Sequence, residues 1–128
     1  MATLKFDKEV SVIVVYVKIK AEDVVLEPKM ALDTGATYVM ISWDMAEKLE
    51  LKPEMSRERI ETVTASGVEK VPLVELPYVS VLGKEVRNIK AIVHDLPPKS
   101  YVDGLLGLSF LRNFNLHLNF REGYLELE

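Results

Sequence analysis

The most informative segment of the chain is Ala31-Leu32-Asp33-Thr34-Gly35-Ala36-Thr37. An apolar strand runs into this segment, and another resumes after it at Val39-Met40-Ile41. The pattern predicts a carboxylate at the end of a strand, presented on a tight turn that Gly35 makes easy. Backbone N–H groups near Gly35 are expected to hold the carboxylate oxygens, and the Thr34 hydroxyl is expected to brace the turn. An ordinary Asp/Gly turn with a local side-chain hydrogen bond is the alternative interpretation.

Short apolar segments typical of β-strands dominate the rest of the chain. Residues 10–19 are rich in β-branched side chains and predict a strand, and residues 24–26 and 30–32 continue the series. Turn residues then separate three pairs of strands. Hairpins are expected around Ser66-Gly67, around Gly83-Lys84 in a type II′ turn, and around Arg121-Glu122-Gly123.

Two short helices are expected among these strands. Ser42 is a suitable N-cap for a helix over residues 43–49, and Asp44 lies favourably in its first turn. A second helix is expected over residues 108–114. Many strands with few helical residues predict an all-β barrel or sandwich.

Composition limits the functional classes. The chain has 128 residues, 48% of them apolar, so we expect residues 1–128 to form a single domain with a real core. The net charge of −4 argues against nucleic acid as the main partner. The absence of cysteine excludes a disulfide framework, a thiolate zinc site and a cysteine nucleophile. His94 and His117 have no ligand-like spacing, so no metal is expected.

Membrane and secretion signals are not expected either. The apolar run over residues 10–17 is far shorter than the ~20 residues of a membrane-spanning helix. The first residues mix charged with apolar side chains, unlike a signal peptide. These features predict a soluble, cytoplasmic protein with no membrane partner. Ser109 lacks the second glycine of a nucleophile elbow, which disfavours a serine hydrolase.

Two further segments accompany the Asp33 turn. Leu105-Leu106-Gly107 leads into the second expected helix, and the hairpin tip Ala65-Ser66-Gly67 carries small residues that suit a cover over a cleft. In this order, the three segments resemble the retropepsin-like aspartic proteases, the single-domain relatives of the retroviral protease. The resemblance is to the cellular and prokaryotic branch of that family and spans nearly the whole chain.

This resemblance implies a fold and a set of site residues. The fold is all-β, a closed acid-protease barrel with one or two short helices. Asp33, Thr34 and Gly35 are the implied catalytic motif, and Leu105, Leu106 and Gly107 are implied to support the catalytic loop. The expected substrate-binding residues of the flap and pocket are Ala36, Ala65, Ser66, Gly67, Ile92 and Val93.

The chemistry of aspartic proteases adds a requirement. It uses two carboxylates about 3 Å apart that share one proton, because like charges that close cannot both ionise. The chain offers one Asp-Thr-Gly, so the second carboxylate must come from another copy across a two-fold axis. Asp103 is a weaker candidate, because no threonine follows it, and a turn or capping role is expected there. By analogy with the retroviral relatives, the resemblance implies that the terminal strands, residues 116–120 and 124–127, supply part of the dimer interface.

The resulting hypothesis is an aspartic endopeptidase that acts as a homodimer on an extended peptide or protein substrate, with no cofactor. Two alternatives stay open. One is a catalytically silent dimerisation or peptide-binding module on the same fold, since a fold does not fix a function. The other is an unrelated β-barrel in which residues 33–35 form only a turn.

Overall fold

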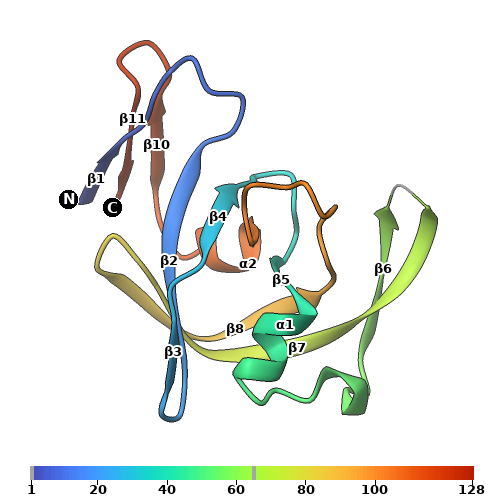
Figure 1. Cartoon of the computed structure of the whole chain (residues 1–128). Coiled ribbons are helices and arrows are strands. Elements are labelled where there is room, and N and C mark those ends of the chain that lie inside the picture. The colour runs from blue at the N-terminus through green and yellow to red at the C-terminus, as the bar shows by residue number, and fades with distance from the viewer. Residues whose placement is uncertain (1, 65) are drawn as a thin grey trace.

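The computed structural model describes residues 2–64 and 66–128. Within these residues the chain forms eleven strands and three short helices (Figure 1). The strands are β1 (Ala2–Lys5), β2 (Val14–Ala21), β3 (Val24–Leu26), β4 (Lys29–Leu32), β5 (Val39–Ile41), β6 (Arg59–Thr64), β7 (Gly67–Val81), β8 (Lys84–Val93), β9 (Gly104–Leu106), β10 (Leu116–Asn119) and β11 (Tyr124–Leu127). The helices are α1 (Trp43–Lys48), the 3-10 helix η1 (Pro53–Met55) and α2 (Leu108–Leu111). The prediction of a mostly β fold is confirmed.

The strands form two sheets. The larger has the order β3-β2-β4-β9-β5-β8-β7-β6, with an additional pairing between β2 and β7. That pairing places Val17 opposite Val81 and Lys20 opposite Tyr78, so β2, β4, β9, β5, β8 and β7 form a closed ring. The smaller sheet has the order β1-β11-β10 and brings the two ends of the chain side by side (Figure 1).

The main core is formed by side chains of the ring strands together with α1, α2 and β11. Strand β2 shows why its sequence forms a strand there. Val15, Val17 and Ile19 alternate with exposed or half-buried residues and are at most 1% exposed, whereas Tyr16 is 70% exposed. This is the period of two that a strand with one buried face requires. Phe110 of α2 is also fully buried in this core, and a buried aromatic of this kind contributes roughly 1.5–3 kcal/mol of stability.

Strand β9 lies between β4 and β5, which are neighbours in sequence. In its parallel pairing with β4, Gly104 lies opposite Met30 and Leu106 lies opposite Leu32. On its other side it pairs with β5, where Leu105 lies opposite Met40. The connection from β4 to β5 must therefore cross the end of β9. That connection carries the Asp33 turn, so residues distant in sequence pack directly beneath it.

The helices differ in how well the sequence predicts them. Ser42 caps α1 as predicted, because its Oγ accepts a hydrogen bond of 3.1 Å from the Met45 N–H. α2 ends at Leu111, before the predicted end at residue 114. There the Asn113 side chain donates to the Phe110 carbonyl, and such local side-chain bonds compete with a continuing helix. In the part of the chain that the structure describes, no helix has the length and apolar character needed to cross a membrane.

Two strand predictions need correction. β2 begins at Val14, not at residue 10, because its neighbour β4 ends at Leu32, where the chain turns away. The β7–β8 turn is centred on Leu82 and Gly83, since Val81 pairs with Lys84. Both central residues have positive φ, 51° and 79°, which is the type I′ geometry and not the predicted type II′.

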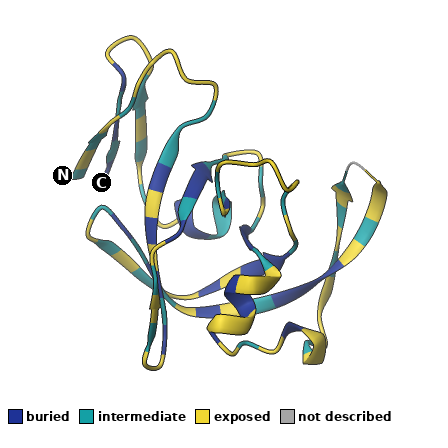
Figure 2. Ribbon diagram, in the orientation of Figure 1, coloured by how far each residue is buried: buried dark blue, intermediate teal, exposed yellow. Residues whose placement is uncertain are grey.

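Strand β7, with 15 residues, is the longest of the described strands. It runs through Pro72 and Pro77, and its register with β8 is the same on both sides of Pro77. Its first part pairs with β6, from Thr64 opposite Gly67 to Arg59 opposite Pro72. We call this part the β6–β7 hairpin. Figure 2 shows that the hairpin is largely exposed toward its tip, while β7 becomes buried where it enters the ring.

Candidate active site

Asp33 follows directly after β4, and its half-buried side chain is held by its own turn. The Gly35 N–H donates a hydrogen bond of 2.9 Å to the Asp33 Oδ1, and the Ala36 N–H donates to the Asp33 carbonyl at 3.2 Å. A Cβ at Gly35 would lie 3.2 Å from that Oδ1, so any larger residue would crowd the carboxylate. The turn therefore fixes the position of one carboxylate oxygen.

The end of β9 braces this turn from below. The Asp33 N–H donates to the Leu106 carbonyl at 3.1 Å, and the Leu108 N–H donates to the Ala36 carbonyl at 2.8 Å. Gly107 lies between these two bonds, and a Cβ there would come within 2.7 Å of the Ala36 carbonyl oxygen and closer still to that of Tyr38. Leu106 is buried in the main core. The segment that resembles the family's supporting segment thus contacts the Asp33 turn directly.

Ser109 also belongs to this brace, a role that the sequence does not predict. Its Oγ accepts a hydrogen bond of 2.8 Å from the Val39 N–H and donates one of 2.7 Å to the Lys90 carbonyl. It therefore joins α2 to β5 and β8, just after the Asp33 turn. No short sequence pattern indicates these hydrogen bonds, because their partners lie 70 and 19 residues away in the sequence.

A cavity of about 380 Å³ lies beside the Asp33 turn. Residues 35–38 of the turn form one wall, residues 60–64 of β6 form the opposite wall, and residues 94–97 form a third. Leu105, Met40 and Ile92 also line it, and Met40 and Ile92 belong to a small apolar cluster separate from the main core. The cavity thus has an apolar floor between the turn and the β6–β7 hairpin.

Of the predicted pocket residues that the structure describes, some line the cavity and others do not. Ala36 and Ile92 line the cavity. Val93 is fully buried in the main core and does not line it, because successive side chains of a strand point to opposite faces. Ser66 and Gly67 lie at the hairpin tip, where the Thr64 Oγ1 accepts from the Ser66 N–H and donates to the Gly67 carbonyl. Ala65 lies outside the described residues.

Asp103 lies far from Asp33. Its carboxylate accepts a hydrogen bond of 2.9 Å from the Lys29 N–H, and its own N–H donates to the Lys29 carbonyl. Lys29 begins the four-residue strand β4, and Asp33 follows its end. Four residues of extended strand span about 13 Å, so the two carboxylates of one chain cannot share a proton. Asp103 instead secures the start of the β4–β9 pair.

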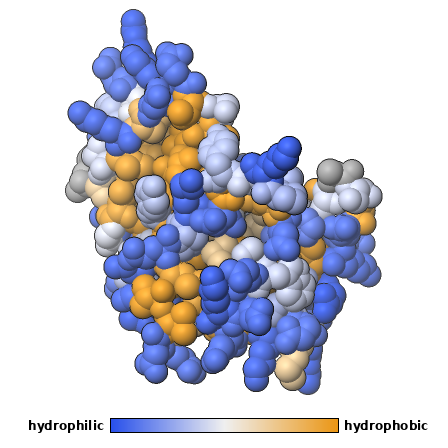
Figure 3. Space-filling view, viewed as in Figure 1, coloured by the Kyte–Doolittle hydropathy of each residue, from blue (hydrophilic) through white to orange (hydrophobic). Residues whose placement is uncertain are grey.

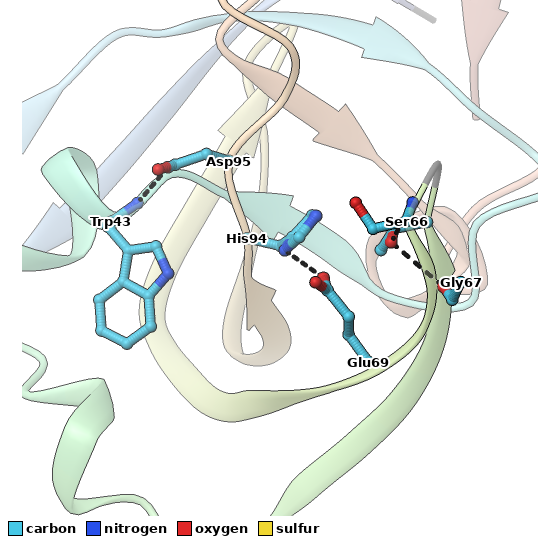
Figure 4. A network of polar contacts seen from close by, with 7 residues as sticks. Trp43, Ser66, Gly67, Glu69, His94 and Asp95 are labelled. Carbon is cyan, nitrogen blue, oxygen red and sulfur yellow. Dashed lines mark hydrogen bonds and ion pairs between the residues drawn. The ribbon is translucent and has the colours of Figure 1, made fainter.

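Figure 4 shows the polar contacts at the far side of the cavity. His94 follows β8, and its Nδ1 lies 3.7 Å from the Glu69 Oε2 on the β6–β7 hairpin. The next residue, Asp95, accepts a hydrogen bond of 3.0 Å from the Trp43 N–H at the start of α1. Among the described residues, no group of three or more His, Asp or Glu side chains is placed to hold a metal ion.

Comparison with known families shows to which family the chain belongs. The family model described as "gag-polyprotein putative aspartyl protease" matches residues 17–113, a stretch that includes the Asp33 turn, the β6–β7 hairpin and the β9 brace. The chain belongs to this aspartyl protease family. The fold is similar to that in a crystal structure of a retropepsin-like aspartic protease from Rickettsia conorii, with a TM-score of 0.73 and 24% sequence identity. That match covers 98% of this chain and 87% of the other. Comparison with curated proteins gives no match.

The predicted family and the predicted retropepsin-like fold are thereby confirmed. The roles of the individual site residues stay predictions.

Proposed function

We propose that the protein, as a single protease domain over residues 1–128, is an aspartic endopeptidase with Asp33 as its catalytic residue. The proposal rests on one observation, the position of the Asp33 carboxylate in a chain that belongs to this family. The carboxylate is held by the Gly35 N–H, on a turn that forms one wall of a cavity. Thr34 and Gly35 complete the catalytic motif of the proposal.

The second carboxylate of the proposal is Asp33 of another copy of the chain. Aspartic proteolysis pairs one ionised with one protonated carboxyl, and Asp103 is too far away to serve. In a two-fold dimer the turns of two subunits would meet at the axis. The ionised carboxylate then takes a proton from water, whose oxygen attacks the peptide carbonyl carbon. The protonated carboxyl meanwhile gives its proton to the carbonyl oxygen, which forms a diol. The carboxyl that took the proton from water then gives it to the amide nitrogen, one diol hydroxyl gives its proton to the other carboxylate, and the C–N bond breaks to leave an acid and an amine.

The surface near the terminal sheet supports such a dimer. Figure 3 shows an apolar area over the region of the terminal strands, on the face that is in view. In that region Phe120 is 63% exposed, whereas Leu116 and Leu118 of β10 are half-buried and pack against the main core. A specific dimer buries about 1,000 Å² or more, and apolar surface of this kind favours it. β1 and β10 each pair on one side only among the described residues, which leaves backbone groups that a partner strand can bind.

The proposed substrate is an extended peptide lying between the Asp33 turn and the β6–β7 hairpin. Extended peptides bind through main-chain hydrogen bonds, while pockets select their side chains. In this chain the pocket is the cavity with the apolar floor of Met40, Ile92 and Leu105. Ser66 and Gly67 at the hairpin tip are proposed to cover the bound peptide.

A covalently linked dimer tests the shared site. One wild-type copy is linked to one Asp33→Asn copy, and peptide cleavage is compared with that of a link between two wild-type copies. The mixed dimer is expected to fold and to be almost inactive, because one carboxylate cannot serve as both base and acid. If the mixed dimer keeps about half of the activity, each chain works alone and the shared site is wrong.

A silent peptide-binding module is the other outcome that this experiment detects. If the linked wild-type dimer binds peptides and cleaves none, the protein belongs to that class. Binding of a transition-state inhibitor of aspartic proteases to the wild-type dimer, with loss of binding in the Asp33→Asn dimer, supports catalysis instead.

A further inference from the structure

The ion pair between Glu69 and His94 crosses from the β6–β7 hairpin to the body of the protein (Figure 4). The hairpin's strands otherwise pair with each other. At its base, the Ser56 Oγ donates to the Leu73 carbonyl, and the Leu73 N–H donates to the Glu58 carbonyl. Between Val71 and the hairpin tip, the Glu69–His94 pair is the single polar contact that the described residues make between the hairpin and the body.

Glu69 lies on the more buried face of the hairpin and lines a hollow next to the cavity, and His94 lines both. It pairs with Thr62 of β6, and directly opposed residues of an antiparallel pair share a face. Thr62 lines the cavity, and both side chains are half-buried. The Glu69 side chain is therefore on the more buried face of the hairpin, whereas the next pair toward the tip, Val63 and Val68, is exposed.

His94 is fixed on the body side. Its N–H donates to the Ile41 carbonyl at 3.0 Å, which holds it beside β5. The following Asp95 side chain is bound to the first N–H of α1. The imidazole thus extends from a segment that two hydrogen bonds hold to β5 and α1. Glu69, in contrast, belongs to the β6–β7 hairpin, whose strands pair mainly with each other.

Resting on the proposed protease function, we propose that Glu69 and His94 are positioning residues that hold the β6–β7 hairpin over the cavity. Their contact sets how tightly an extended peptide is retained. The attraction requires an ionised Glu69 and a protonated imidazole, so the charged neighbours matter. The other charged residues that line the hollows around His94 are Arg59, Glu61, Lys70 and Asp95.

The kinetic test compares Glu69→Gln and His94→Gln with the wild type at pH 5.5, a pH at which imidazole side chains commonly carry a proton. Each variant is expected to raise KM about two- to five-fold, the effect of one partly exposed ion pair, with kcat changed less than two-fold. The double variant is expected to match either single variant, and His94→Lys is expected to restore the wild-type KM. Glu75→Gln, on the same strand but away from the cavity, is the matched control and leaves KM unchanged.

A second measurement needs no catalysis. Amide hydrogen exchange of the β6–β7 hairpin is expected to be about two- to five-fold faster in Glu69→Gln and His94→Gln, with the amides of β4 and β9 unchanged. Unchanged hairpin exchange in both variants would overturn the proposal, as would a double variant whose effect is the product of the two single effects. If the wild type cleaves no peptide but hairpin exchange responds as expected, the protease function fails while the positioning role stands.

Discussion

The Asp33 turn and the β6–β7 hairpin face each other across one cavity, yet they are held in opposite ways. The turn bonds to residues far along the chain, through the Leu106 carbonyl and the Leu108 N–H. The hairpin bonds mainly within itself, with Val63 and Val68 82% and 67% exposed near its tip (Figure 2). Among the described residues, only the ion pair of Glu69 joins the part of the hairpin between Val71 and the tip to the body by a polar contact.

The difference separates two tasks that the proposed function requires. A catalytic carboxylate must keep its position to within a fraction of an ångström, and packing against β9 and α2 provides that. A cover must open to admit a peptide, and a hairpin with few contacts to the body opens at low free energy.

The largest effect is expected from Asp33→Asn. Asparagine has nearly the same shape but cannot act as the base, so peptide cleavage should fall about a thousand-fold or more. The thermal unfolding midpoint should change little. Asp103→Asn is the control, because an amide oxygen can still accept the Lys29 N–H, and its activity should stay near that of the wild type. Cleavage at a wild-type rate by folded Asp33→Asn protein would contradict the assignment of Asp33.

Gly107→Ala should give the next largest effect, on stability. The new Cβ would clash with the carbonyl oxygens of Ala36 and Tyr38, and relieving such overpacking costs typically 1–3 kcal/mol. Gly67→Ala at the hairpin tip meets no atom within 4 Å and has only its positive φ of 113° to strain. We expect a clear loss of urea stability for Gly107→Ala and a smaller, local effect for Gly67→Ala. Equal losses would mean that the turn and the hairpin are equally constrained.

Ser109→Ala removes the hydroxyl that joins Val39 and Lys90. Val39 is fully buried, so its N–H would be left without a partner, which costs about 1–3 kcal/mol. Ser109→Thr keeps the hydroxyl and should recover most of that stability. Urea unfolding of the two variants measures the difference. A Ser109→Ala protein as stable as Ser109→Thr would show that these hydrogen bonds do not brace the region after the turn.

Local patterns in the sequence predict much of the fold. The alternation of β2, the cap at Ser42 and the Asp33 turn all depend on neighbouring residues, and each appears where it was expected, apart from shifted ends. The ring closure by β2 and β7 depends on residues far apart, and no local pattern indicates it. The same holds for β7, because Pro72 and Pro77 ordinarily mark the ends of strands.

The features of the candidate site also differ in whether the local sequence predicts them. The Asp33 turn is visible in the sequence because one short segment contains the carboxylate and the glycine that holds it. Ser109 is not, because its partners become neighbours only when β5, β8 and α2 pack together. Ile92 and Val93 are adjacent and both apolar, so composition alone cannot say which one faces the cavity. The register of β8 decides it in favour of Ile92.

The smallest effect is expected from Val68→Thr, which replaces a methyl group with a hydroxyl on the exposed face of the hairpin. Val68 is 67% exposed, so the hydroxyl meets water and the free energy of unfolding should change by less than about 0.5 kcal/mol. The same substitution at Val79, farther along the same strand and fully buried, places a hydroxyl in the core and should cost about 1–3 kcal/mol. Both substitutions replace valine with threonine on the same strand. The difference between their urea stabilities therefore measures the effect of burial alone. If Val68→Thr destabilised the protein as much as Val79→Thr does, the hairpin would be packed against another surface, and its freedom to act as a cover would be refuted.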